Sequence, residues 1–151
     1  MPRRTTCTSE LARVAAVSLE LRVKESPSAF CHCLECQKRS GSAFAAQARW
    51  PDAQVTLAGR SKTWERVADS GHKATYQFCP DCGSTVAYVI EGWPGVTAVP
   101  VGAFADPGFP APKFSVYEQR KHPWIAVLGE DVKRFSTPSR VRNPGASPVP
   151  L

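Results

Sequence analysis

The sequence lacks any apolar run near the ~20 residues that a membrane-spanning helix requires. The N-terminal Arg3 and Arg4 are not followed by the apolar segment of a secretory signal. We therefore expect an intracellular, cytoplasmic protein with no membrane partner, whose cysteines stay reduced as free thiols or metal thiolates. The alternative is a disulfide scaffold with the six cysteines in three pairs. The sequence also lacks a basic stripe interleaved with aromatic residues, which disfavours nucleic acid as a partner despite the net charge of +6.

Chain length and the distribution of proline divide the sequence into a domain and a tail. With 151 residues the chain fits one hydrophobic core, and a protein of this size does not need disulfides for stability. Residues 138–151 contain four prolines and no periodic apolar pattern, as flexible segments do. We predict one domain over residues 1–137 and a Pro-rich, flexible tail over residues 138–151.

Alternation of apolar and polar residues is the main secondary-structure signal. Val17, Leu19, Leu21 and Val23 alternate with polar residues, which is the pattern of a half-buried strand. Further short strands are predicted at Gln54–Leu57, Lys62–Val67, Ala74–Phe78, Thr85–Ile90, Val96–Val101 and Lys113–Glu118. Because many short strands alternate with glycine and proline turns, we predict a mostly β fold of the sandwich or barrel type.

Only short helices are expected, since 14 prolines and 10 glycines interrupt the chain. A short helix is predicted over Leu34–Ser40, with Gly41 supplying a left-handed C-cap. A further turn of helix is predicted near Pro123–Val127.

Five of the six cysteines fall into two tight clusters. In the first, Cys31, Cys33 and Cys36 have C-x-C-x-x-C spacing, which lets three sulfurs surround one ion at about 2.3 Å. Three protein ligands leave a fourth tetrahedral position open, as in catalytic zinc sites. Three thiolates also weaken the Lewis acidity of zinc, so the site favours thiol chemistry over hydrolysis. The alternative is a reduced cysteine cluster that holds no metal.

The second cluster, Cys79 and Cys82, has the C-x-x-C spacing of a zinc knuckle. Such a pair needs further ligands, and Cys7 is the remaining cysteine. His72, Ser9 and water are the candidates for a fourth position. We predict that Cys7, Cys79 and Cys82 form a second, structural metal site, and the alternative is a metal-free loop.

Residues around the first cluster are candidate substrate contacts. Lys38 and Arg39 follow it directly and are predicted to bind the carboxylates of an anionic thiol, although charges on a short helix are often only solvated. His32 lies between two ligands and could be a fourth ligand or a proton shuttle. Because adjacent residues rarely point at one ion, a role in supporting the site or in contact with solvent is favoured. Three tryptophans either line a cleft or pack in the core: Trp64, Trp93 and Trp124.

Four segments occur in a characteristic order: Cys31–Phe44, Phe78–Ser84, Val101–Pro107 and Lys121–Trp124. Together they resemble the glutathione-dependent formaldehyde-activating (GFA) family, which also includes centromere protein V. The resemblance implies an Mss4-like fold, which is a zinc-containing twisted β-sandwich. It also implies that Cys31, Cys33 and Cys36 hold the active-site zinc. An N-terminal Cys-x-Cys pair would join Cys79 and Cys82 around a structural zinc.

The N-terminus departs from this family pattern. The family usually begins with Cys-x-Cys-Gly, whereas this chain has Cys7-Thr8-Ser9-Glu10. A neutral serine hydroxyl is a poor zinc ligand. We therefore expect a weakened structural site and an active-site cluster that is unaffected.

The resemblance implies condensation of glutathione with formaldehyde to S-hydroxymethylglutathione, which is a carbon–sulfur lyase reaction in reverse. The residues permit this reaction or a related one on another thiol or electrophile, because a thiol that reaches an open zinc position loses its proton. The alternative is a non-catalytic zinc-binding module that contacts nucleic acid or protein, which the basic chain ends allow. A zinc ribbon would show two similar C-x-x-C knuckles, so the unequal clusters favour the enzyme.

Overall fold

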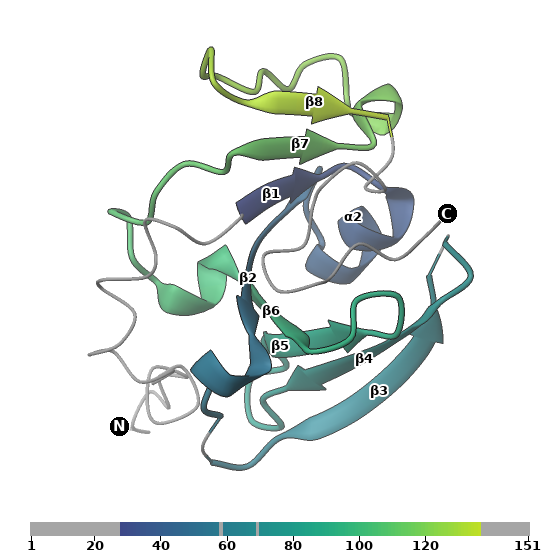
Figure 1. Cartoon of the computed structure of the whole chain (residues 1–151), viewed down its shortest axis with the longest axis vertical. Helices are drawn as coiled ribbons and strands as arrows, with labels where there is room; N and C mark the ends of the chain where they lie inside the picture. Colours follow the sequence, from purple (N-terminus) through teal and green to yellow (C-terminus); the bar gives the residue numbers. More distant parts are fainter. Residues whose placement is uncertain (1–27, 58, 69, 137–151) are drawn as a thin grey trace, which may run out of the picture.

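The structure, a computed structural model, describes residues 28–57, 59–68 and 70–136. In this part of the chain there are eight strands, one α-helix and three short 3-10 helices (Figure 1). The strands are β1 (Ser28–Cys31), β2 (Ala45–Pro51), β3 (Lys62–Val67), β4 (Lys73–Phe78), β5 (Thr85–Ile90), β6 (Val96–Pro100), β7 (Phe114–Val116) and β8 (Lys133–Phe135). The helices are α2 (Leu34–Ser40), η1 (Asp52–Gln54), η2 (Val101–Phe104) and η3 (Glu118–Arg120). The predicted mostly β fold with short helical turns is confirmed.

All eight strands belong to one sheet, in the order β3-β4-β5-β6-β2-β1-β7-β8. Neighbours from β3 to β1 pair antiparallel, whereas β1, β7 and β8 pair in parallel. Figure 1 shows that the sheet is bent, with β3 to β6 below, β1, β7 and β8 above, and β2 running between the two halves. Helix α2 lies between these halves, where an ion pair joins it to β3. Residues of both halves and of α2 line one cavity.

One row of residues crosses the sheet in register on its inner face. Trp64 of β3 pairs with Tyr76 of β4, which pairs with Tyr88 of β5. Tyr88 pairs with Ala98 of β6, which pairs with Arg49 of β2. The aromatic rings stack, with centroids 5.2 Å apart for Trp64 and Tyr76 and 4.9 Å apart for Tyr76 and Tyr88. The row places aromatic and basic side chains together on one wall.

The opposite face of the same strands carries a hydrophobic core. Ala48, Trp50, Ala87 and Val99 form a buried cluster on β2, β5 and β6. They alternate in sequence with the residues of the inner row, because successive side chains of a strand point to opposite faces. Trp50 meets Phe104 of η2 with ring centroids 5.8 Å apart, in an edge-on arrangement. This core stabilises the strands whose other face is available for function.

Helix α2 begins and ends as the sequence predicts. Cys33 is its N-cap residue, and its Sγ accepts the backbone N–H of Cys36 at 3.3 Å. Gly41 ends the helix in the left-handed conformation at φ 63°, where a side chain would cost strain energy. The cap is therefore also a member of the cysteine cluster, so the start of the helix and the cluster are built together.

The predicted strand at Gln54–Leu57 is wrong. The chain forms η1 up to Gln54 and then continues without a strand to Leu57. Asp52 explains the difference. Its backbone oxygen accepts the N–H of Val55 at 3.0 Å, and its carboxylate accepts the hydroxyl of Thr97 at 2.7 Å. These two bonds hold a turn where the apolar pattern indicates a strand.

The predicted turn of helix near Pro123–Val127 is also wrong. The chain makes a hydrogen-bonded β-turn there and no helix, with the N–H of Ile125 donating to the carbonyl of His122 at 3.0 Å. The predicted strand that contains Val17 and Val23 lies outside the described residues, as does the predicted tail over residues 138–151. Among the described helices, none has the length and apolar character needed to cross a membrane.

Three strands were not predicted: β1, β2 and β8. The sequence of β2, Ala-Ala-Gln-Ala-Arg-Trp-Pro, alternates between apolar and polar residues from Ala46 to Trp50, but three of its seven residues are alanine, which is depleted in strands. The structure pairs β2 on both sides and buries five of its seven residues. Strands β1 and β8 have four and three residues, which is too short for any period to show.

Candidate functional site

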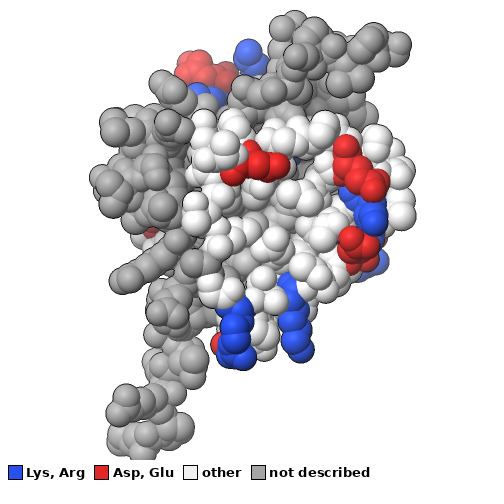
Figure 2. All heavy atoms as spheres, turned by 60° about the horizontal axis from the view of Figure 1, so that its bottom comes forward, with Lys and Arg blue, Asp and Glu red and all other residues white. Residues whose placement is uncertain are grey.

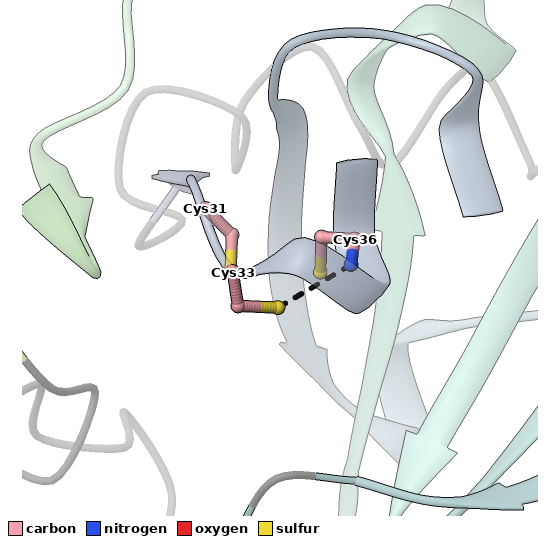
Figure 3. Close-up of side chains that lie close together, drawn as sticks. All are labelled: Cys31, Cys33 and Cys36. Carbon is pink, nitrogen blue, oxygen red and sulfur yellow. Dashed lines mark hydrogen bonds between the residues drawn. The ribbon is translucent and has the colours of Figure 1, made fainter. Parts of the chain in front are cut away.

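The three cysteines of the first cluster come together at the junction between β1 and α2. Cys31 is the last residue of β1, Cys33 caps α2, and Cys36 lies in its first turn. All three are buried, and their Sγ atoms lie within 4.8 Å of one another (Figure 3). They are the only group of three or more potential metal ligands among the described residues. The spacing therefore produces the convergence that the sequence predicts.

The donor set fits a zinc ion. Sulfurs bound tetrahedrally at about 2.3 Å lie about 3.8 Å apart, so separations within 4.8 Å need only a small contraction. Thiolate is the ligand type that zinc shares with other soft metals, and burial limits competition from water. All three cysteines also line a cavity, from which a fourth ligand can reach them. The site thus has three protein ligands and one accessible side.

Without a cation the three sulfurs share protons. Hydrogen bonds from Cys31 and then from Cys36 lower the pKa of Cys33 strongly, and burial only partly offsets them. The hydrogen bond to Cys33 is also the largest cause that raises the pKa of Cys31, together with the bond to Cys36 and burial. Among the three thiols, that of Cys33 therefore loses its proton most readily. Ionisation of all three sulfurs requires a positive charge among them.

The cavity beside the cluster has a volume of about 570 Å³. Basic and aromatic side chains make up much of its wall: Arg49, Arg66, Arg120, Tyr76, Tyr88 and Trp93. None of the described residues that line it is an aspartate or a glutamate. An excess of one charge sign in a low-dielectric cleft raises the local concentration of the opposite charge. The cavity is therefore suited to an anion.

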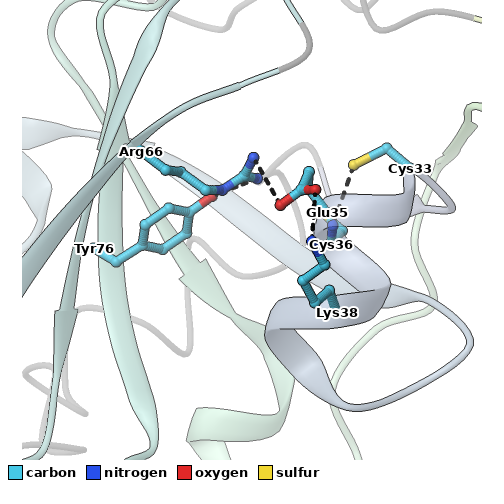
Figure 4. Close-up of polar contacts among 6 residues, drawn as sticks. All are labelled: Cys33, Glu35, Cys36, Lys38, Arg66 and Tyr76. Atoms are coloured by element: carbon cyan, nitrogen blue, oxygen red, sulfur yellow. Dashed lines mark hydrogen bonds and ion pairs between the residues drawn. The ribbon is translucent and has the colours of Figure 1, made fainter.

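Arg66 reaches from β3 toward helix α2, as Figure 4 shows. Its Nη2 donates to the phenolic oxygen of Tyr76 at 3.1 Å, and its Nη1 lies 3.7 Å from a carboxylate oxygen of Glu35. The side chain of Arg66 is only 12% exposed. The arginine thus joins the lower half of the sheet to the helix that carries Cys36, and it places a positive charge beside the cysteines.

Arg49 is buried in β2, and its guanidinium stacks on the indole of Trp93 at 3.9 Å from the ring centroid. Sequence reasoning missed Arg49, Arg66 and Arg120. Arg49 could have been noticed as an arginine among mostly small or apolar residues of a strand, but β2 was not predicted as a strand. For Arg66 and Arg120 no local signal exists, because only the sheet order brings them to the cavity.

Lys38 and Arg39 lie outside the cavity lining. The side chain of Lys38 is 77% exposed, and its Nζ pairs with Glu35 at 3.2 Å. Arg39 instead packs over the rings of Tyr76 and Tyr88, at 5.2 Å and 5.4 Å from their centroids. Lys38 therefore faces solvent, whereas Arg39 packs against two tyrosines of the cavity wall.

His32 points away from the cavity, into the protein. It has no exposed surface, and its Nε2 lies 3.1 Å from the hydroxyl of Ser115 on β7. Ser115 in turn donates to the carboxylate of Glu118, which pairs with Lys121 at 3.1 Å. Burial lowers the pKa of His32, which favours the neutral ring. This chain of contacts joins the cysteine loop to η3, as expected of a residue that supports the site.

Gln37 connects helix α2 to the same part of the chain. Its amide nitrogen donates to the carbonyls of His32 at 2.8 Å and Arg120 at 3.2 Å. Its amide oxygen lies 2.8 Å from Nε2 of His122, which makes that nitrogen the donor. Gln37 therefore holds the end of η3, where Arg120 borders the cavity.

The second cysteine cluster forms a tight turn. Cys79 is buried. Its backbone N–H donates to the carbonyl of Ser84 at 2.9 Å, and its carbonyl accepts the N–H of Gly83 at 2.8 Å. Cys82 is exposed and disulfide-bonded, which differs from the expected reduced thiol, and its Sγ lies 3.2 Å from the hydroxyl of Ser84. No third ligand from the described residues joins the pair.

Two of the further candidates for this second site, Cys7 and Ser9, lie outside the described residues. The third candidate, His72, lines the cavity of the first cluster. Of the three tryptophans, Trp93 lines that cavity, Trp64 stacks on Tyr76, and Trp124 is 69% exposed.

Comparison with known proteins identifies one family, although no curated protein matches the chain. The family model described as glutathione-dependent formaldehyde-activating enzyme matches residues 7–120, which is 114 of the 151 residues. The matched segment contains both cysteine clusters and β1 to β7, so it includes every strand that borders the cavity. The chain belongs to the glutathione-dependent formaldehyde-activating enzyme family.

Proposed function

We propose that the protein is a zinc-dependent enzyme that adds glutathione to formaldehyde to give S-hydroxymethylglutathione, the reverse of a carbon–sulfur lyase reaction. The observation that carries this proposal is the convergence of three buried sulfurs on a cavity lined by arginines and by no described acid. Cys31, Cys33 and Cys36 would hold the ion. When bound, zinc lowers the pKa of a thiol that joins it and so supplies a thiolate at neutral pH.

The reaction balances without an oxidant or reductant. A bond forms between the glutathione sulfur and the aldehyde carbon, and the carbonyl becomes a hydroxyl. The thiol loses one proton and the new hydroxyl gains one, so a residue that donates a proton to the hydroxyl regains one from the thiol. The protein therefore needs to orient two reactants and to supply one proton, and a buried site accelerates such reactions by fixing their geometry.

The arginines are the proposed contacts for the two glutathione carboxylates. Guanidinium binds carboxylate through two parallel hydrogen bonds, and such bonds are strengthened by the burial of Arg49 and the low exposure of Arg66, at 12%. Arg120 is more exposed and lies at the end of η3, where it would contact the outer end of the tripeptide. We assign Lys38 and Arg39 to the approach of the anionic substrate, because they lie outside the lining.

Tyr88 is the proposed proton donor to the aldehyde oxygen. It lines the cavity, and burial, followed by the charge of Cys36, raises its pKa well above the usual tyrosine value. The phenol thus stays protonated at neutral pH, as a hydrogen-bond donor must. Its dependence on the charge of Cys36 also indicates that the phenol lies near the sulfurs.

The alternative function, a zinc module that contacts nucleic acid, has less support. Figure 2 shows a largely uncharged face, on which the Lys and Arg side chains stand apart or beside Asp and Glu. Nucleic-acid modules carry a continuous basic stripe, which this face does not show. The arginines of the cavity are buried or bordered by aromatic rings rather than spread over a surface.

The test combines zinc content with exchange kinetics. Elemental mass spectrometry would measure zinc per chain on protein purified without chelator or metal-affinity resin. Magnetisation-transfer NMR would measure exchange between formaldehyde and S-hydroxymethylglutathione, which also occurs without a catalyst. We expect faster exchange with the protein and none of that gain in Cys33→Ser, whereas Leu34→Ala, altered at a neighbouring exposed side chain, keeps it. Protein that binds zinc yet leaves the exchange rate at its uncatalysed value would overturn the proposal.

A further inference from the structure

The cavity is larger than glutathione and formaldehyde require. Glutathione has about 20 non-hydrogen atoms and would fill roughly 300 Å³ at the packing density of protein interiors. Formaldehyde adds only two such atoms. The cavity of about 570 Å³ therefore has space for a further group about the size of an aromatic ring or larger. The cavity can therefore hold a larger ligand than these two reactants supply.

Aromatic and aliphatic side chains of β4, β5 and the turn after β5 border one side of the cavity. Tyr76 and Tyr88 are neighbours in register with stacked rings, and Ile90 lies on the same face two residues after Tyr88. The chain then turns, with the N–H of Trp93 donating to the carbonyl of Ile90 at 2.8 Å. This turn brings the indole of Trp93 to the cavity next to Ile90. All four side chains line the cavity. Formaldehyde has no apolar surface to place against them.

Building on the proposed function, we propose that the site takes glutathione adducts of aromatic aldehydes. The glutathione sulfur adds to the carbonyl carbon of the aldehyde, the carbonyl oxygen gains the thiol proton, and the aromatic ring packs on Tyr88, Ile90 and Trp93. The arginines bind the tripeptide, as they would with formaldehyde. The substrate class follows from the wall, because burial of apolar surface on both partners favours the larger adduct.

Two stable thioethers test this inference without the reversible chemistry. S-methylglutathione mimics the adduct of a small aldehyde, and S-benzylglutathione carries the additional ring. Isothermal calorimetry on the zinc-loaded protein would give both dissociation constants. We expect S-benzylglutathione to bind at least about tenfold more tightly, as burial of an aromatic ring supports. Equal affinities would overturn the inference.

A matched pair of variants on β5 locates the ring. Ile90→Trp fills the space beside the wall and is expected to remove the preference for S-benzylglutathione, with S-methylglutathione binding within about threefold. Val89→Trp adds the same ring at a neighbouring position that is 42% exposed and lies outside the cavity lining, so it should keep the preference. If Ile90→Trp does not fold, Trp93→Ala serves instead, and it should reduce the preference to less than about threefold. If Ile90→Trp or Trp93→Ala kept the full preference for S-benzylglutathione over S-methylglutathione, the inference would be overturned.

The two failures are distinguishable. If both thioethers bind equally, the aromatic-aldehyde inference fails and the glutathione site stands. If neither thioether nor glutathione itself binds to zinc-loaded protein, the proposed function fails, and this inference fails with it.

Discussion

The two cysteine clusters of this chain use the same residue type at similar spacing, yet the fold gives them different surroundings. Cys31, Cys33 and Cys36 are all buried and converge on a cavity with basic and aromatic walls. In the second cluster Cys79 is buried and Cys82 is exposed, and no other described residue completes a ligand set. The difference shows that cysteine spacing proposes a metal site, while the surrounding elements decide whether it faces a substrate.

The physical cause lies in the elements that carry each cluster. The first spans a strand end and the first turn of a helix, and it is enclosed by both halves of the bent sheet. The second occupies a turn after β4, whose backbone hydrogen bonds are satisfied within the turn by Ser84 and Gly83. A turn can hold a metal and stabilise a fold, but it does not supply a water-excluding cavity.

The largest expected effect comes from exchanging one sulfur in each cluster. Cys33→Ser should abolish zinc binding at the cavity and reduce the catalysed exchange rate by more than about 100-fold, because a hydroxyl is a poor zinc ligand. Cys82→Ser should instead act on stability and leave the exchange rate within about threefold. Elemental analysis and NMR exchange kinetics measure both. Similar losses of activity in the two variants would remove the distinction between the clusters.

A second test addresses the cavity wall that distinguishes the first cluster. Arg66→Gln should weaken glutathione binding by about tenfold, since a nearly buried charge-assisted contact is lost. Lys38→Gln is the control, because Lys38 is 77% exposed and its ion pair with Glu35 contributes little. Calorimetry on zinc-loaded protein gives both constants. A larger effect at Lys38 than at Arg66 would move the carboxylate contacts from the cavity to the helix end.

The third test completes the second cluster. Ser9→Cys restores the second sulfur of the Cys-x-Cys pattern that the family resemblance implies, so zinc retention should increase. The melting temperature should rise by several degrees, because a bound metal stabilises the folded state. Differential scanning calorimetry and elemental analysis measure the two changes. An unchanged or lower melting temperature would show that residue 9 does not limit metal binding there.

The smallest expected effect concerns acidic residues beside the two clusters. In Glu118, burial raises the pKa, but bonds to Ser115 and Lys121 outweigh it and lower the pKa below the unfolded value of 4.5. A depressed folded-state pKa stabilises the protein above the unfolded value, and the stabilisation is lost as the pH falls through the folded value. Glu118→Gln should therefore flatten the loss of stability below about pH 4.5 and cost less than about 1 kcal/mol at neutral pH.

The control for Glu118 is Asp81, which belongs to the second cluster. Its ion pair with Arg60 is exposed on both sides, at 79% for Arg60 and 52% for Asp81, so Asp81→Asn should change little. Urea unfolding at a series of pH values measures both variants. A steeper change for Asp81 than for Glu118 would contradict the assignment of the stronger network to the first cluster.

The success of sequence reasoning differed between elements for physical reasons. The bounds of α2, β3 and β5 match the prediction, because the glycine cap of the helix and the β-branched and aromatic residues of the strands are local signals. Strand β2 was missed because three of its seven residues are alanine, which is depleted in strands. The strand at Gln54–Leu57 was wrongly predicted because a distant partner, Thr97, fixes the turn at Asp52.

The sequence by itself determined the cysteine cluster, since C-x-C-x-x-C spacing across a strand end and a helix start brings three sulfurs together whatever surrounds them. Only the tertiary structure decided what the sulfurs face. Arg49, Arg66 and Arg120 belong to β2, β3 and η3, and they meet at one cavity because the strand order and the bend of the sheet place those elements around α2. Long-range strand pairing has no local sequence signal, so neither the wall nor its preference for ligands can be read from spacing.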